Sequence, residues 1–296
     1  MPMRAQALHR ETKIIATTGP VTTNNLSSEE YTAFQKFLED AAGIVLGDNK
    51  HYLVTSRLGR LMADGGIKSL GDLLNLLTRD ARLRERVIDA MTTNETSWFR
   101  DAHPFEVFKE HILPDVAKKG GGPIRVWSAA CSSGQEPYSL SMCVQEYLAS
   151  HPGSLRGDVE IIATDISPTV LEEAKAGVYD DIALGRGLAA ERRTRFFQKN
   201  GDHLEVRKEI KARVNFRSIN LSQNYAALGK FNVIYCRNVL IYFSTDMKRD
   251  VLQRMANILV PGGFLVLGGS ESMANYCDAF QMVRVANGVI YQLKPR

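Results

Sequence analysis

The stretch that most constrains the fold is 124–138, which reads IRVWSAACSSGQEPY. Its apolar first half, Ile124 to Ala130, predicts a strand buried on both faces, as in a parallel sheet. The small residues Cys131-Ser132-Ser133-Gly134 predict a tight turn, and Pro137 favours the first turn of a helix. Because a helix start has unpaired N–H groups, this order can hold a nucleotide-like ligand. A structural turn without a ligand is the alternative, since Gly134 is the only glycine of a G-x-G-x-x-G fingerprint here.

A second apolar run, Val159 to Asp165, predicts another buried strand, and this one ends in an acid. An acid in that position commonly accepts hydrogen bonds from ribose hydroxyls. Alternatively, Asp165 caps the helix expected after Ser167-Pro168. Further strands are predicted at Phe231 to Cys236 and Phe264 to Gly268, followed by a hairpin at the C-terminus. These elements predict an α/β fold with a doubly wound, mostly parallel sheet.

Two other regions flank or interrupt the predicted sheet. Apolar residues at helical spacing over 26–92 predict a small helical domain with its own core. Residues 1–25 are polar and slightly basic without an apolar segment, so we expect a disordered tail and no signal peptide. The segment 178–214 carries many charges and an Asn-Gly turn signal, which predicts an inserted small β-subdomain.

The segment 93–103 between the helical domain and the sheet is predicted to be a linker. It contains Trp98 and Phe99, which are costly to leave exposed, so we expect it to pack down. A linker packed over a ligand crevice would reach the ligand. In the helical domain, Arg57 and Arg60 fall on one basic face. That face is either solvated or a docking surface for an acidic helix.

Composition excludes several classes. No apolar run among the 296 residues approaches the length of a membrane span, and the net charge of +4 is too small to imply nucleic acid. The four cysteines show no C-x-x-C spacing, which argues against zinc or a disulfide framework and suits a reduced cytoplasm.

Five motifs occur in order: TTNETSWFRD, RVWSAACSSGQEPYSL, ATDIS, INL and CRNVLIYF. Together they resemble the CheR family of bacterial chemotaxis receptor methyltransferases, and the resemblance covers roughly Ser27 to Lys294. It implies a class I, Rossmann-like methyltransferase domain over 104–296. It also implies a cytoplasmic enzyme that uses S-adenosylmethionine, and no metal, to methylate glutamate side chains on the helices of chemoreceptors. The product of the cofactor would be S-adenosylhomocysteine.

The resemblance also implies roles for individual residues. Arg100 and Tyr242 match the residues nearest the reacting methyl group, and Arg57 and Arg60 lie where the family presents a basic face to receptor helices. Because a glutamate is already ionised at neutral pH, no general base is required. Cofactor contacts are implied for Asn94, Thr96, Arg100, Glu136, Asp165, Asn220, Leu221, Arg237 and Asn238.

One departure from the family concerns the inserted subdomain. Members that bind a receptor's C-terminal peptide usually have a longer, glycine-rich hairpin tip, whereas 198–204 is short and has one glycine. We therefore expect this chain to act without such a tether. Whether a regulatory protein binds is not indicated by the sequence.

Three rival functions remain at this stage. A nucleic-acid methyltransferase commonly has an Asn/Asp-Pro-Pro-aromatic motif after the fourth strand, where this chain has Arg237-Asn238-Val239-Leu240. A non-catalytic adaptor that binds the cofactor is disfavoured because Arg100 and Tyr242 are present. A nicotinamide oxidoreductase is disfavoured because the glycine fingerprint is missing.

Overall fold

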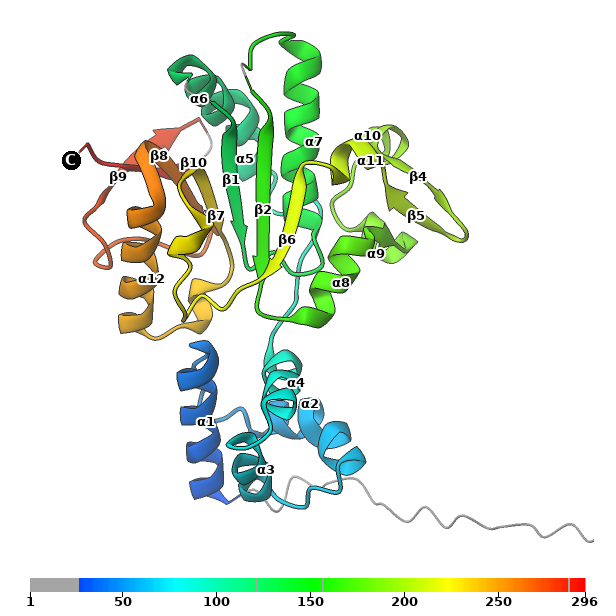
Figure 1. The fold of residues 1–296 in the computed structure, drawn as a ribbon, viewed down its shortest axis with the longest axis vertical. Helices are drawn as coiled ribbons and strands as arrows, with labels where there is room; N and C mark the ends of the chain where they lie inside the picture. The colour runs from blue at the N-terminus through cyan, green and yellow to red at the C-terminus, as the bar shows by residue number, and fades with distance from the viewer. Residues whose placement is uncertain (1–26, 121, 156, 287, 296) are drawn as a thin grey trace, which may run out of the picture.

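The computed structural model describes residues 27–120, 122–155, 157–286 and 288–295. Figure 1 shows two parts: a group of helices near the N-terminus and an α/β unit whose sheet has helices on both faces. The expected tail over 1–25 lies outside the described residues. In the part of the chain that is described, no helix has the length and apolar character that crossing a membrane requires.

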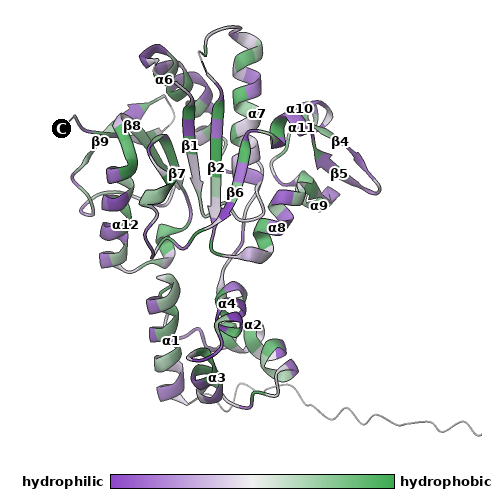
Figure 2. Cartoon of the chain, in the orientation of Figure 1, coloured by the Kyte–Doolittle hydropathy of each residue, from purple (hydrophilic) through white to green (hydrophobic). Residues whose placement is uncertain are grey.

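The helical domain consists of α1 (Ser28–Ala42), α2 (His51–Asp64), α3 (Leu70–Leu77) and α4 (Ala81–Met91). Ser27 caps α1 by accepting the N–H three residues later, and Gly43 ends the helix in left-handed backbone with φ 73°. Phe34, Leu58 and Leu73 are fully buried in a core separate from that of the sheet. Figure 2 shows the basis of this core, because the helices have distinct hydrophobic and hydrophilic sides.

The main sheet has the strand order β6-β2-β1-β7-β8-β10-β9. Its strands are β1 (Ile124–Ala129), β2 (Val159–Asp165), β6 (Val214–Ser218), β7 (Phe231–Cys236), β8 (Leu259–Leu267), β9 (Phe280–Val285) and β10 (Gly288–Leu293). The strands from β6 to β8 in this order are parallel, and β10 pairs antiparallel with both β8 and β9. The predicted fold class, a doubly wound and mostly parallel sheet, is confirmed.

Helices cover both faces of this sheet. One face carries α5 (His103–Val107), α6 (Leu113–Lys119), α7 (Gln135–Ser150) and α8 (Pro168–Ala176), and the other carries α12 (Thr245–Ile258). A π-helical turn at Phe108–Ile112 joins α5 to α6. Neighbouring strand residues enter opposite layers: Val126 and Ile161 pack with α7, whereas Trp127 and Ile162 pack with α12. Burial on both faces explains why these strands are apolar without alternation.

The prediction for β8 was too short. The strand was expected at Phe264 to Gly268, but it begins at Leu259, directly after α12, and runs through Pro261. The register with β7 shifts between Phe231 and Val233. This irregularity explains how a proline, which has no N–H to donate, is tolerated within the strand.

The inserted subdomain lies between α8 and β6 and projects from the side of the main sheet (Figure 1). It holds β3 (Val178–Tyr179), α9 (Asp181–Gly185), α10 (Ala190–Phe196), β4 (Phe197–Asn200), β5 (His203–Val206) and α11 (Lys208–Lys211). The three strands form an antiparallel sheet in the order β3-β5-β4. The expected hairpin forms, but its turn is shifted by one residue: Asn200 pairs with His203 at the end of β4, and Gly201-Asp202 makes the two-residue turn. Gly201 has φ 60° and Asp202 has no positive φ, so the turn is not the type I′ turn that Asn-Gly favours.

The helical domain packs against the carboxyl edge of the main sheet. Asp89 of α4 accepts hydrogen bonds from the hydroxyls of Ser167 and Thr169, the latter at 2.6 Å. The N–H of Val45, after α1, donates to the carbonyl of Tyr242 at 2.8 Å. The edge of the sheet at which ligands usually bind is therefore covered by a second domain.

Candidate functional site

A cavity of about 340 Å³ lies between the helical domain and the carboxyl ends of β1, β2 and β7. Ligand pockets commonly measure roughly 300–1,000 Å³, and open parallel sheets bind ligands at this edge. All the predicted site residues except Arg60 line the cavity: Arg57, Asn94, Thr96, Arg100, Glu136, Asp165, Asn220, Leu221, Arg237, Asn238 and Tyr242. Residues from distant parts of the chain therefore converge on one space.

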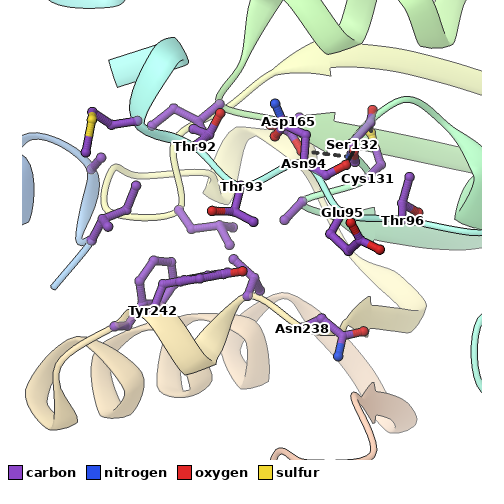
Figure 3. A pocket seen from close by; sticks show the side chains of 18 of the residues that line it. Thr92, Thr93, Asn94, Glu95, Thr96, Cys131, Ser132, Asp165, Asn238 and Tyr242 are labelled. Carbon is purple, nitrogen blue, oxygen red and sulfur yellow. Dashed lines mark hydrogen bonds between the residues drawn. The ribbon is translucent and has the colours of Figure 1, made fainter. Parts of the chain in front are cut away.

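The turn after β1 joins two walls of this cavity. The N–H of Ser132 donates to Oδ2 of Asp165 at 2.8 Å, and its hydroxyl donates to the carbonyl of Asn94 at 3.0 Å (Figure 3). Gly134 has φ 94°, and a Cβ there would lie only 3.0 Å from the Cβ of Ala174. Gly134 thus lets α8 approach the turn closely, while Ser132 ties the end of β2 and the linker to it.

Asp165 ends β2 and is only 6% exposed. Its Oδ1 accepts the N–H of Ser167 at 3.0 Å, but Ser167 itself caps α8 by accepting the N–H of Val170. Asp165 is therefore not the helix cap, which removes one of its two interpretations. Burial raises the pKa of the Asp165 carboxyl, although backbone N–H groups of Ser167 and Ser132 oppose the shift. Further donors, such as a pair of vicinal hydroxyls, would stabilise its ionised form.

A buried ion-pair network closes the side of the cavity at β7. The Arg237 side chain is 1% exposed and donates from Nη1 to Glu136 at 3.0 Å and from Nη2 to Asp101 at 2.8 Å. Nη2 also donates to the carbonyl of Arg100, and Glu136 accepts a second hydrogen bond from Ser128 at 2.7 Å. The Nε–H of Arg237 is buried and has no acceptor among the described residues. A ligand with an acceptor oxygen would satisfy it.

The linker packs down as predicted, since Trp98 and Phe99 are buried. The Trp98 ring lies against Tyr179 and Phe197 of the inserted subdomain, with centroid distances of 4.9 and 5.2 Å. The backbone N–H of Trp98 donates to the carbonyl of Arg186 at 3.0 Å. The inserted subdomain therefore holds the linker segment that presents Asn94, Thr96 and Arg100 to the cavity.

The helical domain supplies a wall that sequence reasoning missed. This wall consists of Ala42, Ile44, Val45, Leu46, Gly47, Lys50 and Leu53. Asn220, after β6, donates from Nδ2 to the carbonyl of Ala41 at 2.8 Å, while its Oδ1 accepts from Ser222. The amide of Asn220 thus joins the two domains. The apolar run 44–46 in a loop between two helices was the available signal for this wall.

The two arginines of the predicted basic face have different surroundings. Arg57 donates to the carbonyls of Met91 and Thr92 at 2.7 and 3.0 Å and to the hydroxyl of Thr93 at 3.0 Å. Arg60 has a side chain that is 94% exposed and lies 3.8 Å from Asp64. Arg57 therefore fastens the start of the linker, a role that sequence reasoning missed, whereas Arg60 lies outside the cavity.

Covalent and metal chemistry find little support at this site. In the described ranges, no group of three or more His, Cys, Asp or Glu side chains could hold a metal ion. Cys131 lines the cavity, but burial raises the pKa of its thiol well above the ordinary value, and the nearby Asp165 and Glu136 add to the shift. A thiol that stays protonated is a poor nucleophile.

Both parts of the chain match known proteins. Residues 29–92 match the family described as the CheR methyltransferase all-alpha domain, and residues 94–289 match its SAM-binding domain. A chemotaxis protein methyltransferase of Vibrio anguillarum is 53% identical over 93% of this chain and 100% of its own length. Chemotaxis protein methyltransferase 1 of Pseudomonas aeruginosa is 52% identical over 90% of this chain and 99% of its own.

Solved structures align more weakly. The N-methyltransferase NodS of Bradyrhizobium japonicum, in complex with S-adenosylhomocysteine, covers 70% of this chain and 95% of its own. Its TM-score is 0.38 at 15% identity, which is too low to support any inference about the site.

Proposed function

Because this chain belongs to the CheR methyltransferase family, we propose that it is a cytoplasmic protein-glutamate O-methyltransferase acting on the helices of chemotaxis receptors. The observation that carries the proposal is the convergence of the family's matched residues on one cavity between the two domains. The names of its relatives favour neither a nucleic-acid methyltransferase nor a cofactor-binding adaptor.

S-adenosylmethionine supplies an activated methyl group when bound, and the residues present fit this cofactor. Asp165 offers a buried carboxylate for the ribose hydroxyls, and Arg237 offers a buried Nε–H that lacks an acceptor in the described structure. Asn94 and Thr96 would contact the cofactor from the linker, and Leu221 would border its adenine. Glu136 lines the cavity at the start of α7, where it would contact the cofactor, and it also pairs with Arg237.

The protein has little acid–base chemistry to perform. A glutamate substrate is ionised at neutral pH, and the buried Cys131 thiol remains protonated, so no general base or nucleophile is assigned. The chain instead orients the substrate and excludes water, effects that together are worth several kcal/mol. Arg100 would orient the substrate carboxylate. Tyr242, which lies across the cavity from Asn94 (Figure 3), would face the carboxylate from that side.

The decisive experiment uses a tritiated methyl donor and receptor-containing membranes, followed by treatment with base. Base hydrolyses a methyl ester to a carboxylate and releases its label as volatile methanol, whereas methylated nitrogen keeps the label. Arg100→Ala and Tyr242→Phe serve as variants expected to fold but to lose turnover. The absence of base-labile label with the unmodified protein would reject the proposed reaction, and an adaptor that binds the cofactor would then be favoured.

The different surroundings of Arg57 and Arg60 lead to a prediction about docking. Arg60→Glu should raise the KM for receptor severalfold at low salt, with a smaller effect at high salt, because the exposed positive charge of Arg60 attracts acidic helices.

Arg57→Ala should weaken binding of S-adenosylhomocysteine, because the substitution releases the linker at Met91 and Thr92. Initial rates and calorimetry measure the two effects. A change in receptor KM alone for Arg57→Ala would contradict the role of its linker contacts.

The short β4–β5 turn supports a second prediction. We propose that receptor methylation here does not depend on a tether, since the hairpin tip consists of a two-residue turn with one glycine. Calorimetry with C-terminal receptor peptides should detect no tight binding. Micromolar or tighter binding that is lost when Gln198 and Lys199 on the edge strand are replaced would contradict the proposal.

A further inference from the structure

The loop after β7 carries Arg237, Asn238 and Tyr242 into the cavity, but several of its backbone N–H groups have no hydrogen-bond partner within the loop. Asn238 has left-handed backbone with φ 58°, and only a single 3₁₀ turn, Leu240–Tyr242, follows. The N–H groups of Asn238, Val239 and Ile241 are therefore not paired within a helix. Buried or half-buried N–H groups of this kind require acceptors from elsewhere.

Glu271, from the segment after β8, supplies these acceptors. Its Oε2 accepts the N–H of Asn238 at 2.7 Å and that of Gly268 at 2.8 Å. Its Oε1 accepts the N–H of Val239 at 3.0 Å and that of Ile241 at 3.3 Å. In the described part of the chain, the hydrogen-bond partners of this half-buried carboxylate are these four backbone N–H groups. Parallel pairing of β7 with β8, with Cys236 opposite Leu267, brings the two loops side by side.

The chemistry of the side chain is specific. A glutamine has one acceptor oxygen, and its NH₂ group would face two N–H donors, so it could not reproduce the four hydrogen bonds. Glu271 does not line the cavity, although Asn238 and Tyr242 do. They lie across the cavity from Asp165 and Asn94 (Figure 3). A change at Glu271 would therefore reach one wall of the site and leave the opposite wall in place.

We propose that Glu271 is a positioning residue for methyl transfer, which holds the loop 237–242 so that Tyr242 faces the reacting groups. This inference rests on the proposed function. A displacement of about 1 Å at such a site can lower the rate on the order of 100-fold. Loss of Glu271 should lower kcat much more than it weakens binding of S-adenosylhomocysteine. Asp165 and the linker stay in place, and the Arg237 side chain is still held by Glu136 and Asp101, so that Asn238 is the one cofactor contact that would be disturbed.

The structure also provides a matched pair of glycine variants. A Cβ on Gly268 would lie 2.7 Å from Oε2 of Glu271 and 2.9 Å from Nδ2 of Asn238, whereas a Cβ on Gly269 would meet nothing within 4 Å. Gly268→Ala should therefore disturb the same junction without removing the carboxylate. Gly269→Ala, one residue away, is the control.

The test measures kcat, receptor KM, the affinity for S-adenosylhomocysteine and amide hydrogen exchange over 237–242. For Glu271→Gln and Gly268→Ala, kcat per folded protein should fall at least about tenfold while affinity changes less than about threefold, and the loop amides should exchange faster. Gly269→Ala should match the unmodified protein. If Glu271→Gln is poorly folded, Gly268→Ala alone decides the outcome.

Two outcomes would overturn the inference, and they are distinguishable. An unchanged kcat in both variants, with a fully active unmodified protein, rejects the positioning role but leaves the proposed function intact. A fall in affinity as large as the fall in kcat shows that Glu271 only maintains the cavity. An unmodified protein without methyl transfer would reject the proposed function itself, and faster loop exchange in Glu271→Gln would then report a purely structural carboxylate.

Discussion

Replacing Asp165 with alanine should weaken the binding of S-adenosylhomocysteine by at least about 100-fold. In the proposed complex, the buried carboxylate at the end of β2 would accept hydrogen bonds from two ribose hydroxyls, and hydrogen bonds to charged groups contribute roughly 1.5–3 kcal/mol each. The loss of two such bonds corresponds to about 3 kcal/mol or more, or at least two factors of ten in affinity. Titration calorimetry measures this difference directly.

The matched control is Glu160→Ala. Glu160 is a carboxylate on the same strand, but it pairs with Arg125 at 2.8 Å and does not line the cavity. Its removal should leave the affinity for S-adenosylhomocysteine unchanged. Equal losses of affinity in the two variants would show that the effect arises from destabilising β2, and not from the cavity.

The raised pKa of Asp165 also predicts how binding depends on pH. In the free protein, the raised pKa means that folding favours the protonated form of Asp165. The contribution of Asp165 to the free energy of unfolding is therefore fully present below its ordinary pKa of about 3.9, and it is lost as the pH rises through the raised value. The ionised carboxylate therefore costs stability at neutral pH. Because hydroxyl donors favour the ionised form, affinity should fall as the pH is lowered through the raised pKa, and Asp165→Asn should lack this dependence.

The second large effect is expected for Arg237→Met. Methionine fills a similar space but leaves Glu136 buried without its partner and removes a donor from Asp101 and from the carbonyl of Arg100. Breaking a buried pair in this way costs about 3–5 kcal/mol, which chemical denaturation would measure as a lower free energy of unfolding. Cofactor binding should be lost as well.

A double variant separates stability from binding. Arg237→Met combined with Glu136→Gln removes the uncompensated charge, so part of the lost stability should return while binding remains weak. Arg249→Met is the surface control, because its pair with Asp246 is largely exposed and should contribute little. If Arg237→Met were as stable as this control, the network would not be a structural support of the cavity.

Much of the fold follows from local patterns. The apolar runs at β1, β2 and β7 are long enough for strands and lack alternation, which predicts burial on both faces. Placing Asp165 and Arg237 at the carboxyl ends of two such strands predicts that they share one edge of the sheet. Trp98 and Phe99 similarly indicated that the linker is packed. In each case neighbours in the sequence carried the information.

The long-range contacts of Glu271, Arg57 and Asn220 could not be assigned in this way. Glu271 accepts the N–H of Ile241, 30 positions away, Arg57 donates to Met91, 34 positions away, and Asn220 donates to Ala41, 179 positions away. A lone glutamate after a strand has the same local pattern whether it is solvated or accepts four backbone N–H groups.

The sequence alone determined three features of the fold: which segments are buried strands, which residues stand at their carboxyl ends, and that a separate helical domain precedes them. This is possible because periodicity and turn chemistry are properties of short segments. Only the tertiary structure decided that α1 and α2 cover the cavity, that Arg57 holds the linker, and that Glu271 supports the loop bearing Tyr242. These contacts depend on how two domains and two adjacent loops pack, and packing is a property of the whole chain.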